Sequence, residues 1–227
     1  MRASLSVGRV TRVMLWIVLA LCAAHVIQAL YFLAGDIEYI KMIDLDIEGN
    51  LPSIYSAFAI AFCSMLLFVI AIDQRRKRAE GRVQWMILAF IFLFLALDEA
   101  VSIHEELGDV FHAILETKGL LYFAWVIPYT VVALFLGFAF LKFVWRLPRG
   151  VRIQFIVAGV LFLTGAVGIE VVSAWEADRH GTTTPLYTIL YTIEEFLEMI
   201  AIVIFANALL KFIGREIGTV AIEFRGA

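Results

Sequence analysis

Six apolar runs, each long enough to cross a bilayer as an α-helix, constrain this chain more than any other feature. A bilayer crossing takes about 20 helical residues. The runs cover residues 13–32, 54–72, 83–102, 120–145, 153–175 and 187–213. Apolar residues follow one another in them without the alternation typical of strands. We therefore predict an all-α polytopic membrane protein, a single domain over residues 1–227 built as a bundle of six transmembrane helices.

Composition excludes several classes of protein. Apolar residues make up 63% of the chain and charged residues 17%, whereas soluble domains average about 45–50% and about 25%. The net charge is −3, and no basic face exists outside short loops, so we expect no nucleic-acid partner. Cys22 and Cys63 both lie inside apolar runs and form no Cys-x-x-Cys motif. Disulfide-rich and nucleic-acid-binding classes are therefore disfavoured.

The distribution of lysine and arginine predicts the orientation. Cytoplasmic loops of membrane proteins are enriched in these residues. All but three of the 18 basic residues lie in the N-terminal segment, the C-terminal segment and the second and fourth connections; the exceptions are Lys41, Lys118 and Arg179. We therefore predict that both termini are cytoplasmic and that loops 33–53, 103–119 and 176–186 face outward. This indicates a multi-pass protein of the bacterial inner membrane.

Two of the outer connections are long enough to carry structure. The first contains several acids and ends in Gly49-Asn50-Leu51-Pro52-Ser53, a turn signal with Ser53 as the predicted helix cap. Whether Glu48 stays in water or folds over a site is left open by the sequence. Residues 103–118 keep a helical period, which predicts a short interfacial helix after the third span. Its acidic and basic side chains are expected to form a solvated face: Glu105, Asp109 and His112.

Carboxylates interrupt the apolar runs, where an ionised side chain is costly and by default marks function. At a rise of about 1.5 Å per residue, all of them are predicted to lie in the outer half of the bilayer. They are Asp98 and Glu99 in the third run, Glu170 in the fifth, and Glu194, Glu195 and Glu198 in the sixth.

Helical spacing predicts that these acids share one site. Residues three and four apart lie on the same helix face, as Glu194 and Glu198 do. Small residues at Ala158, Gly165 and Gly168 permit a close approach of the fifth span, which carries Glu170. No lysine or arginine lies in the outer halves of the spans to neutralise these charges. The acids must therefore be protonated, line a water-filled cavity or bind cations.

A divalent cation is the partner that this donor set favours. Carboxylate oxygens suit Mg²⁺, Ca²⁺, Mn²⁺ and iron, and a single nitrogen ligand from His104 moves the preference toward Fe or Mn. Mg, Ca and Zn remain alternatives, although the histidines are too scattered for a typical zinc site. Glu176 and His180 also have ligand-like spacing, but their loop position predicts a solvated pair. The predicted metal ligands are Asp98, Glu99, His104, Glu170, Glu194, Glu195 and Glu198.

At these residues the chain resembles a set of uncharacterised bacterial six-helix membrane proteins. The resemblance is carried by Asp-Glu-Ala-x-Ser-Ile-His-Glu at 98–105, Gly-Ala-x-Gly-x-Glu at 165–170 and Glu-Glu-x-x-Glu-Met at 194–199. An acid-Gly-Asn-x-Pro segment at 48–52 precedes the second span. The resemblance implies a six-helix fold and no named activity. Four-helix di-iron carboxylate proteins use Glu-x-x-His pairs, and this sequence has none, so it departs from that pattern.

Three function classes fit these features. The first is a membrane metalloprotein, and specifically an oxidoreductase or hydrolase, that acts on a lipid-soluble or periplasmic substrate. The second is a proton or divalent-cation transporter, although the inner halves of the spans lack matching acids. The third is an accessory subunit of a larger membrane complex, with another membrane protein as partner. In each class membrane lipid surrounds the chain.

Overall fold

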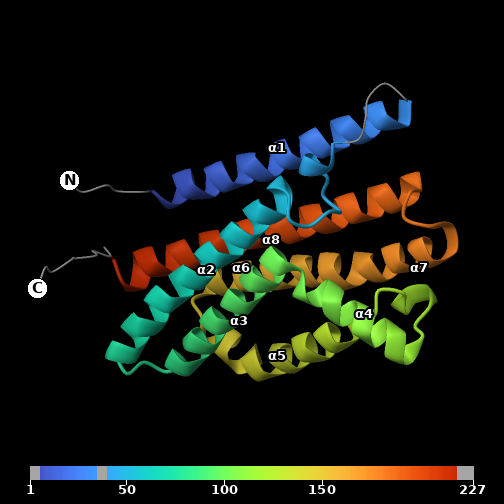
Figure 1. Cartoon of the computed structure of the whole chain (residues 1–227). Coiled ribbons are helices and arrows are strands. Elements are labelled where there is room, and N and C mark those ends of the chain that lie inside the picture. Colours follow the sequence, from blue (N-terminus) through green and yellow to red (C-terminus); the bar gives the residue numbers. More distant parts are fainter. Residues whose placement is uncertain (1–5, 35–39, 219–227) are drawn as a thin grey trace, which may run out of the picture.

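Helices form every regular element in the part of the chain that the structure, a computed structural model, describes: residues 6–34 and 40–218 (Figure 1). The long helices are α1 (Val7–Ala34), α2 (Leu51–Arg76), α3 (Arg82–Val101), α5 (Val126–Arg146), α6 (Arg149–Leu163) and α8 (Pro185–Glu216). The shorter elements are η1 (Lys41–Ile43), α4 (Ile103–Leu115), η2 (Gly119–Leu121), η3 (Thr164–Ile169) and α7 (Glu170–His180). Arg2, Arg225 and part of the predicted loop 33–53 lie outside the described residues.

Six helical segments are long and apolar enough to span a membrane, which confirms the predicted number of candidate spans. The fifth combines α6, η3 and α7 and runs to His180, beyond the predicted end at Trp175. The fourth begins at Val126 and not at Leu120, because Gly119 takes a positive φ of 63° and starts a short turn instead. Large apolar side chains cover the outside of the helices; Phe138, for example, is 78% exposed.

The long helix α8 runs through the middle of the bundle, with α1, α2, α6 and α7 packed around it (Figure 1). Its second half is buried among apolar side chains, including Phe205 and Leu209. Near the end of the bundle where the described chain begins and ends, Trp85 packs against the rings of Phe143 and Phe212 with centroids 5.0 Å and 4.8 Å away. This aromatic cluster fills the core at that end, while the polar groups of the spans gather toward the opposite end.

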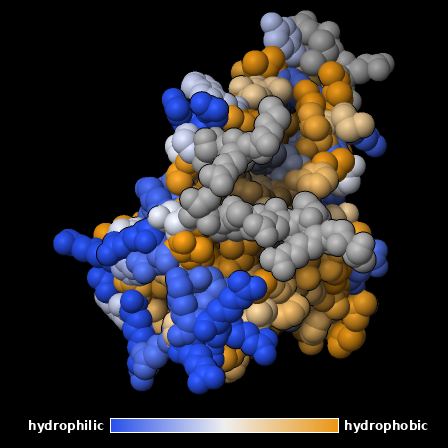
Figure 2. All heavy atoms as spheres, turned by 90° about the vertical axis from the view of Figure 1, so that its left-hand side faces the viewer, coloured by the Kyte–Doolittle hydropathy of each residue, from blue (hydrophilic) through white to orange (hydrophobic). Residues whose placement is uncertain are grey.

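Basic side chains mark the end of the bundle where the described chain begins and ends. The α2–α3 turn carries Lys77 and Arg78, and the α5–α6 connection carries Arg146 and Arg149. Figure 2 looks onto this end and shows hydrophilic side chains gathered there between apolar flanks. The fold therefore separates these basic turns from the carboxylates that interrupt the apolar runs, as the charge pattern predicts. The side of the membrane on which each end lies stays a prediction.

A capping box begins α2, and it corrects the predicted cap. Asn50 is the N-cap, and its side chain accepts a hydrogen bond from the Ser53 backbone N–H at 3.3 Å. Ser53 occupies the third helical position and accepts in return from the Asn50 N–H at 3.0 Å. The Asn50 amide also donates to the carbonyls of Lys41 and Asp44. The cap thus ties the acidic segment 40–50 to the start of α2.

The helix after the third span is present, but it does not continue α3. Ser102 adopts a left-handed conformation, with φ 56° and ψ 42°, which is uncommon for a residue other than glycine. The chain turns there and starts again as α4. The helical period predicted for residues 103–118 is therefore separate from that of α3, and His104 folds back toward the end of α3.

A π-helical turn, η3, interrupts the fifth span beside α8. Such turns are frequent at functional sites because they rotate the following side chains relative to an α-helix. Gly165 within it touches α8 so closely that an added Cβ would lie 2.9 Å from the Glu194 carbonyl oxygen and 3.1 Å from Glu198 Cγ. Gly168 lacks such a contact with α8, because an added Cβ would meet only Leu163 and Thr164 at 3.9 Å. Of the predicted small residues, Gly165 thus makes the close approach.

Candidate functional site: an acidic pocket between the helices

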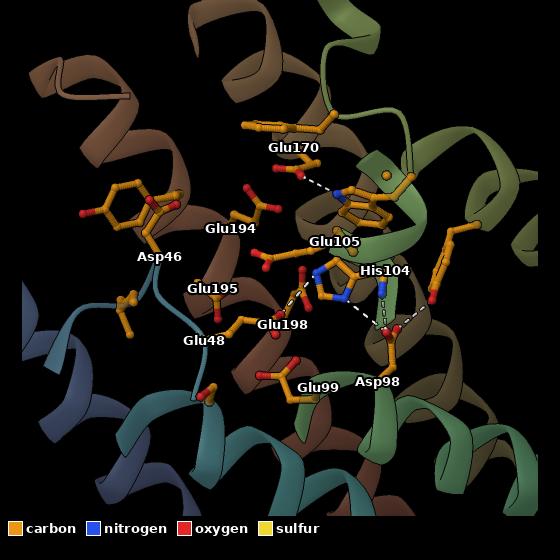
Figure 3. Close-up of a pocket in the computed structure, with 18 of the residues that line it drawn as sticks. Asp46, Glu48, Asp98, Glu99, His104, Glu105, Glu170, Glu194, Glu195 and Glu198 are labelled. Atoms are coloured by element: carbon orange, nitrogen blue, oxygen red, sulfur yellow. Dashed lines mark hydrogen bonds and ion pairs between the residues drawn. The ribbon is translucent and has the colours of Figure 1, made fainter. Parts of the chain in front are cut away.

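One pocket of about 460 Å³ collects side chains from the segment after η1 and from α3, α4, α5, α7 and α8. All seven sequence-predicted ligands line it (Figure 3). Two histidines, His104 and His112, are its only basic side chains, since no lysine or arginine stands among the described residues of its wall. Ten carboxylates line it: Asp46, Glu48, Asp98, Glu99, Glu105, Asp109, Glu170, Glu194, Glu195 and Glu198.

Three of these carboxylates come from one turn of α8. Figure 3 shows Glu194, Glu195 and Glu198 directed toward the same space from that helix. Glu194 is 8% exposed. Because Gly165 leaves no side chain between η3 and α8, the α8 carboxylates and Glu170 approach each other from two packed helices. The contact predicted from the small residues is thus what places the two groups of acids in one pocket.

Glu170 is positioned by hydrogen bonds from two different elements. The indole Nε1–H of Trp125 donates to Glu170 Oε1 at 3.0 Å. The Ser173 hydroxyl lies 3.2 Å from Glu170 Oε2 and 3.4 Å from Glu194 Oε2, although its nearest acceptor is the Glu170 backbone carbonyl at 3.0 Å. These contacts hold the acid of the fifth span toward those of α8.

Asp98 and His104 form one hydrogen-bonded unit. The turn at Ser102 lets the His104 backbone N–H donate to Asp98 Oδ1 at 2.7 Å, and His104 Nδ1 lies 3.2 Å from the same oxygen. The hydroxyl of Tyr129 donates to Asp98 Oδ2 at 2.9 Å. Both oxygens of Asp98 are thus engaged, while the remaining ring nitrogen of His104 faces the pocket.

That ring nitrogen, Nε2, lies 3.2 Å from Glu48 Oε1. The Ser102 hydroxyl donates to the other oxygen of Glu48. Burial alone would lower the pKa of His104, but the hydrogen bond to Asp98 and the charge of Glu48 raise that pKa to about 9. Burial also raises the pKa of Glu48, to about 8, so His104 Nε2 and Glu48 hold a proton between them at neutral pH. The acidic loop thus folds over the site, which answers the question that the sequence left open.

Glu48, His104 and Glu105 offer three ligand atoms within 4.8 Å of one another. Among the described residues no other three acidic, histidine or cysteine side chains converge so closely. Glu105 was expected on a solvated face; it is exposed, yet it also lines the pocket. The signal that points to it is its place directly after His104. The other predicted acids share the pocket without joining this group of three.

The segment that carries Glu48 is pinned by α1 and α8. His25 Nδ1 accepts from the Leu45 backbone N–H at 3.3 Å, and the hydroxyl of Tyr191 donates to Asp44 Oδ1 at 3.3 Å. The hydroxyl of Tyr187 donates to Asp46 Oδ1 at 3.0 Å. Sequence reasoning did not find these contacts, because each joins residues that are far apart in the chain.

Glu176 and His180 lie outside the pocket. They form the predicted pair and His180 is exposed, but the pair lies on α7 and not in a loop, and Glu176 is buried. Glu176 accepts a hydrogen bond from the Thr184 hydroxyl at 2.8 Å and lies 2.9 Å from His180 Nδ1. Since Thr184 is also the N-cap of α8, these contacts join the end of α7 to the start of α8.

Comparison with known proteins places the chain in a family without supplying an activity. Residues 12–212 match a family described as a domain of unknown function (DUF8692), and the chain belongs to that family. Neither a curated protein nor a solved structure matches it. The function therefore has to be argued from the pocket itself.

Proposed function

We propose that this chain is an integral membrane metalloprotein of the bacterial inner membrane that binds divalent cation in the acidic pocket and acts as an enzyme on a lipid-soluble or periplasmic substrate. One observation supports this above all others: ten carboxylates line a single pocket whose described wall has no lysine or arginine. Carboxylates that share a pocket repel one another when they are ionised. A bound cation relieves the repulsion and compensates for the lost hydration.

The donor set indicates which cation fits. Carboxylate oxygens are hard ligands, and His104 and His112 add imidazole nitrogen, of which His104 converges with Glu48 and Glu105. This mixture favours Fe or Mn, while Mg, Ca and Zn are weaker candidates. When bound, the cation would supply Lewis acidity toward a polar substrate group or, if redox-active, electron transfer.

His104 Nε2, Glu48 and Glu105 form the proposed centre of the ligand set, because their ligand atoms already converge. Glu99, Glu170 and the three acids of α8 would supply the remaining oxygens. Asp98 has a different role, since it holds His104 Nδ1 and both of its oxygens are engaged. Carboxylates placed in this way behind a ligating histidine fix its ring orientation and raise its basicity. Cation binding would then displace the proton that His104 shares with Glu48.

The half of the bundle that carries the basic turns favours a metalloprotein over a transporter. Beyond Glu198, the buried face of α8 is apolar and includes Ile202, Phe205 and Leu209. Ions crossing the membrane would need polar groups through this region. A pocket confined to one end of the bundle suits binding and chemistry better than passage.

Elemental analysis of the protein purified without chelators tests the proposal. The wild type is expected to hold Fe or Mn at a fixed stoichiometry. Glu198→Gln, which removes one charge with little change of shape, should lose most of that metal. Glu106→Gln is the matched control, because Glu106 is exposed on α4 and lies outside the pocket wall. A wild type that holds no metal and takes up none of Fe²⁺, Mn²⁺, Mg²⁺, Ca²⁺ or Zn²⁺ would refute the proposal; full metal content in Glu198→Gln would remove Glu198 from the ligand set.

A further inference from the structure

A second cavity, of about 820 Å³, lies next to the acidic pocket among α3, α5, α6 and α8. Its wall is almost entirely apolar and includes Phe92, Leu136, Ala158 and Phe205. No aspartate, glutamate, lysine, arginine or histidine stands among the described residues that line it, and the volume falls within the range of about 300–1,000 Å³ typical of small-molecule sites. The cavity therefore suits an apolar ligand of substantial size.

The two cavities share a wall. Leu95, Trp125, Tyr129, Phe162 and Ala166 line both. Trp125 and Tyr129 present their rings to the apolar cavity and direct their polar atoms to Glu170 and Asp98 in the acidic pocket. A molecule at this junction would meet apolar surface on one side and carboxylates on the other.

We propose that the apolar cavity holds the hydrocarbon chain of an amphiphilic membrane lipid whose polar group reaches the acidic pocket past Trp125 and Tyr129. This inference rests on the proposed function and names the substrate class of the same site. A lipid with one long chain and an oxygen-bearing polar end matches both halves of the combined space.

Other occupants fit the cavity less well. Water needs two to four polar partners, and this wall offers it almost none. A transmembrane helix of a partner is about 30 Å long, whereas the cavity wall follows α3 only from Ile87 to Leu95, a length of about 12 Å. The cavity is too short for such a helix. A chain-bearing lipid can also enter from the bilayer, because the cavity lies between membrane-spanning helices.

Photolabelling of the full chain in lipid nanodiscs tests this inference. The probe is hexadecanol with a diazirine at the chain end, and peptide mass spectrometry locates the adducts. We expect adducts on α6 around Ala158 and on α8 around Phe205, residues of the cavity wall. Gly159→Leu should reduce these adducts at least several-fold, because nothing lies within 4 Å of a Cβ at Gly159 and the new side chain enters the cavity.

Gly137→Leu is the matched control. Gly137 also has nothing within 4 Å of an added Cβ, but it lies outside the cavity wall on α5. Adducts at the cavity residues should persist in that variant. Labelling that is as strong at the exposed Phe138 as at the cavity residues, or that is unchanged in Gly159→Leu, would overturn the inference.

Metal content measured on the same samples separates the two proposals. Metal present without cavity labelling refutes the lipid-chain site and leaves the metalloprotein intact. Cavity labelling with no metal refutes the proposed function and leaves the chain site standing.

Discussion

The orientation of a single imidazole decides what the acidic pocket can bind. His104 is held on one side by Asp98 and on the other by Glu48. The left-handed turn at Ser102 brings His104 within reach of Asp98. The Ser102 hydroxyl also donates to Glu48. One residue with an unusual backbone conformation thus assembles three side chains from two separate segments. Its local strain is typical of functional sites.

Asp98→Asn should weaken metal binding without unfolding the protein. An asparagine oxygen can still accept from the His104 backbone N–H, but the charge that supports the imidazole is lost. Changes behind a ligating histidine lower metal affinity about 10- to 100-fold. Competition titration with Fe²⁺ or Mn²⁺ measures this change. Tyr129→Phe removes only one hydrogen bond to Asp98 and should have a smaller effect; wild-type affinity in Asp98→Asn would contradict the positioning role.

At the scale of elements, the contact between η3 and α8 brings the acids of the fifth and sixth spans together. The glycine at 165 is required because the backbone of α8, including the Glu194 carbonyl, occupies the space of a side chain. The π-helical turn then rotates the chain before Glu170. Packing of two helices, and not the spacing within either one, sets the width of this part of the pocket.

Gly165→Ala should force η3 and α8 apart. Overpacking of this kind costs about 1–3 kcal/mol, and the neighbouring carbonyl cannot rotate away as a flexible side chain would. Thermal unfolding in detergent should show a lower midpoint, and metal content should fall with it. Gly168→Ala is the control, since its Cβ would make only ordinary contacts at 3.9 Å. Equal stability of the two variants would show that the close approach of η3 and α8 does not require glycine at position 165.

At the scale of the whole molecule, charge is divided between the two ends of an apolar bundle. The basic turns lie at one end, and the acidic pocket lies toward the other. Positively charged segments are retained on the cytoplasmic side during insertion. We therefore expect the acidic pocket to open toward the periplasmic half of the membrane.

Cysteine labelling tests this orientation. Thr182 lies in the exposed turn between α7 and α8, and Ala79 lies in the α2–α3 turn at the opposite end. A membrane-impermeant thiol reagent should label Thr182→Cys in cells with a permeabilised outer membrane, and Ala79→Cys only after the inner membrane is disrupted. The wild type, whose Cys22 and Cys63 lie within helices, sets the background. The reverse pattern would place the pocket on the cytoplasmic side.

The sequence by itself determined the six candidate spans, the division of charge and the seven predicted residues of the pocket. These properties are local: hydropathy and helical spacing act over a few turns, and burying an acid in an apolar run is costly wherever the helix packs. Gly165 was also predictable, because close helix packing in a membrane favours small residues.

Only the tertiary structure decided how those residues meet. It brought Glu48 against His104, placed Tyr129 and Trp125 behind Asp98 and Glu170, and left an apolar cavity beside the carboxylates. Each of these features joins segments that are distant in the chain or depends on the turn at Ser102. Contacts of this kind leave no periodic signal in a sequence, because they arise from the packing of whole helices and not from the preference of any one residue.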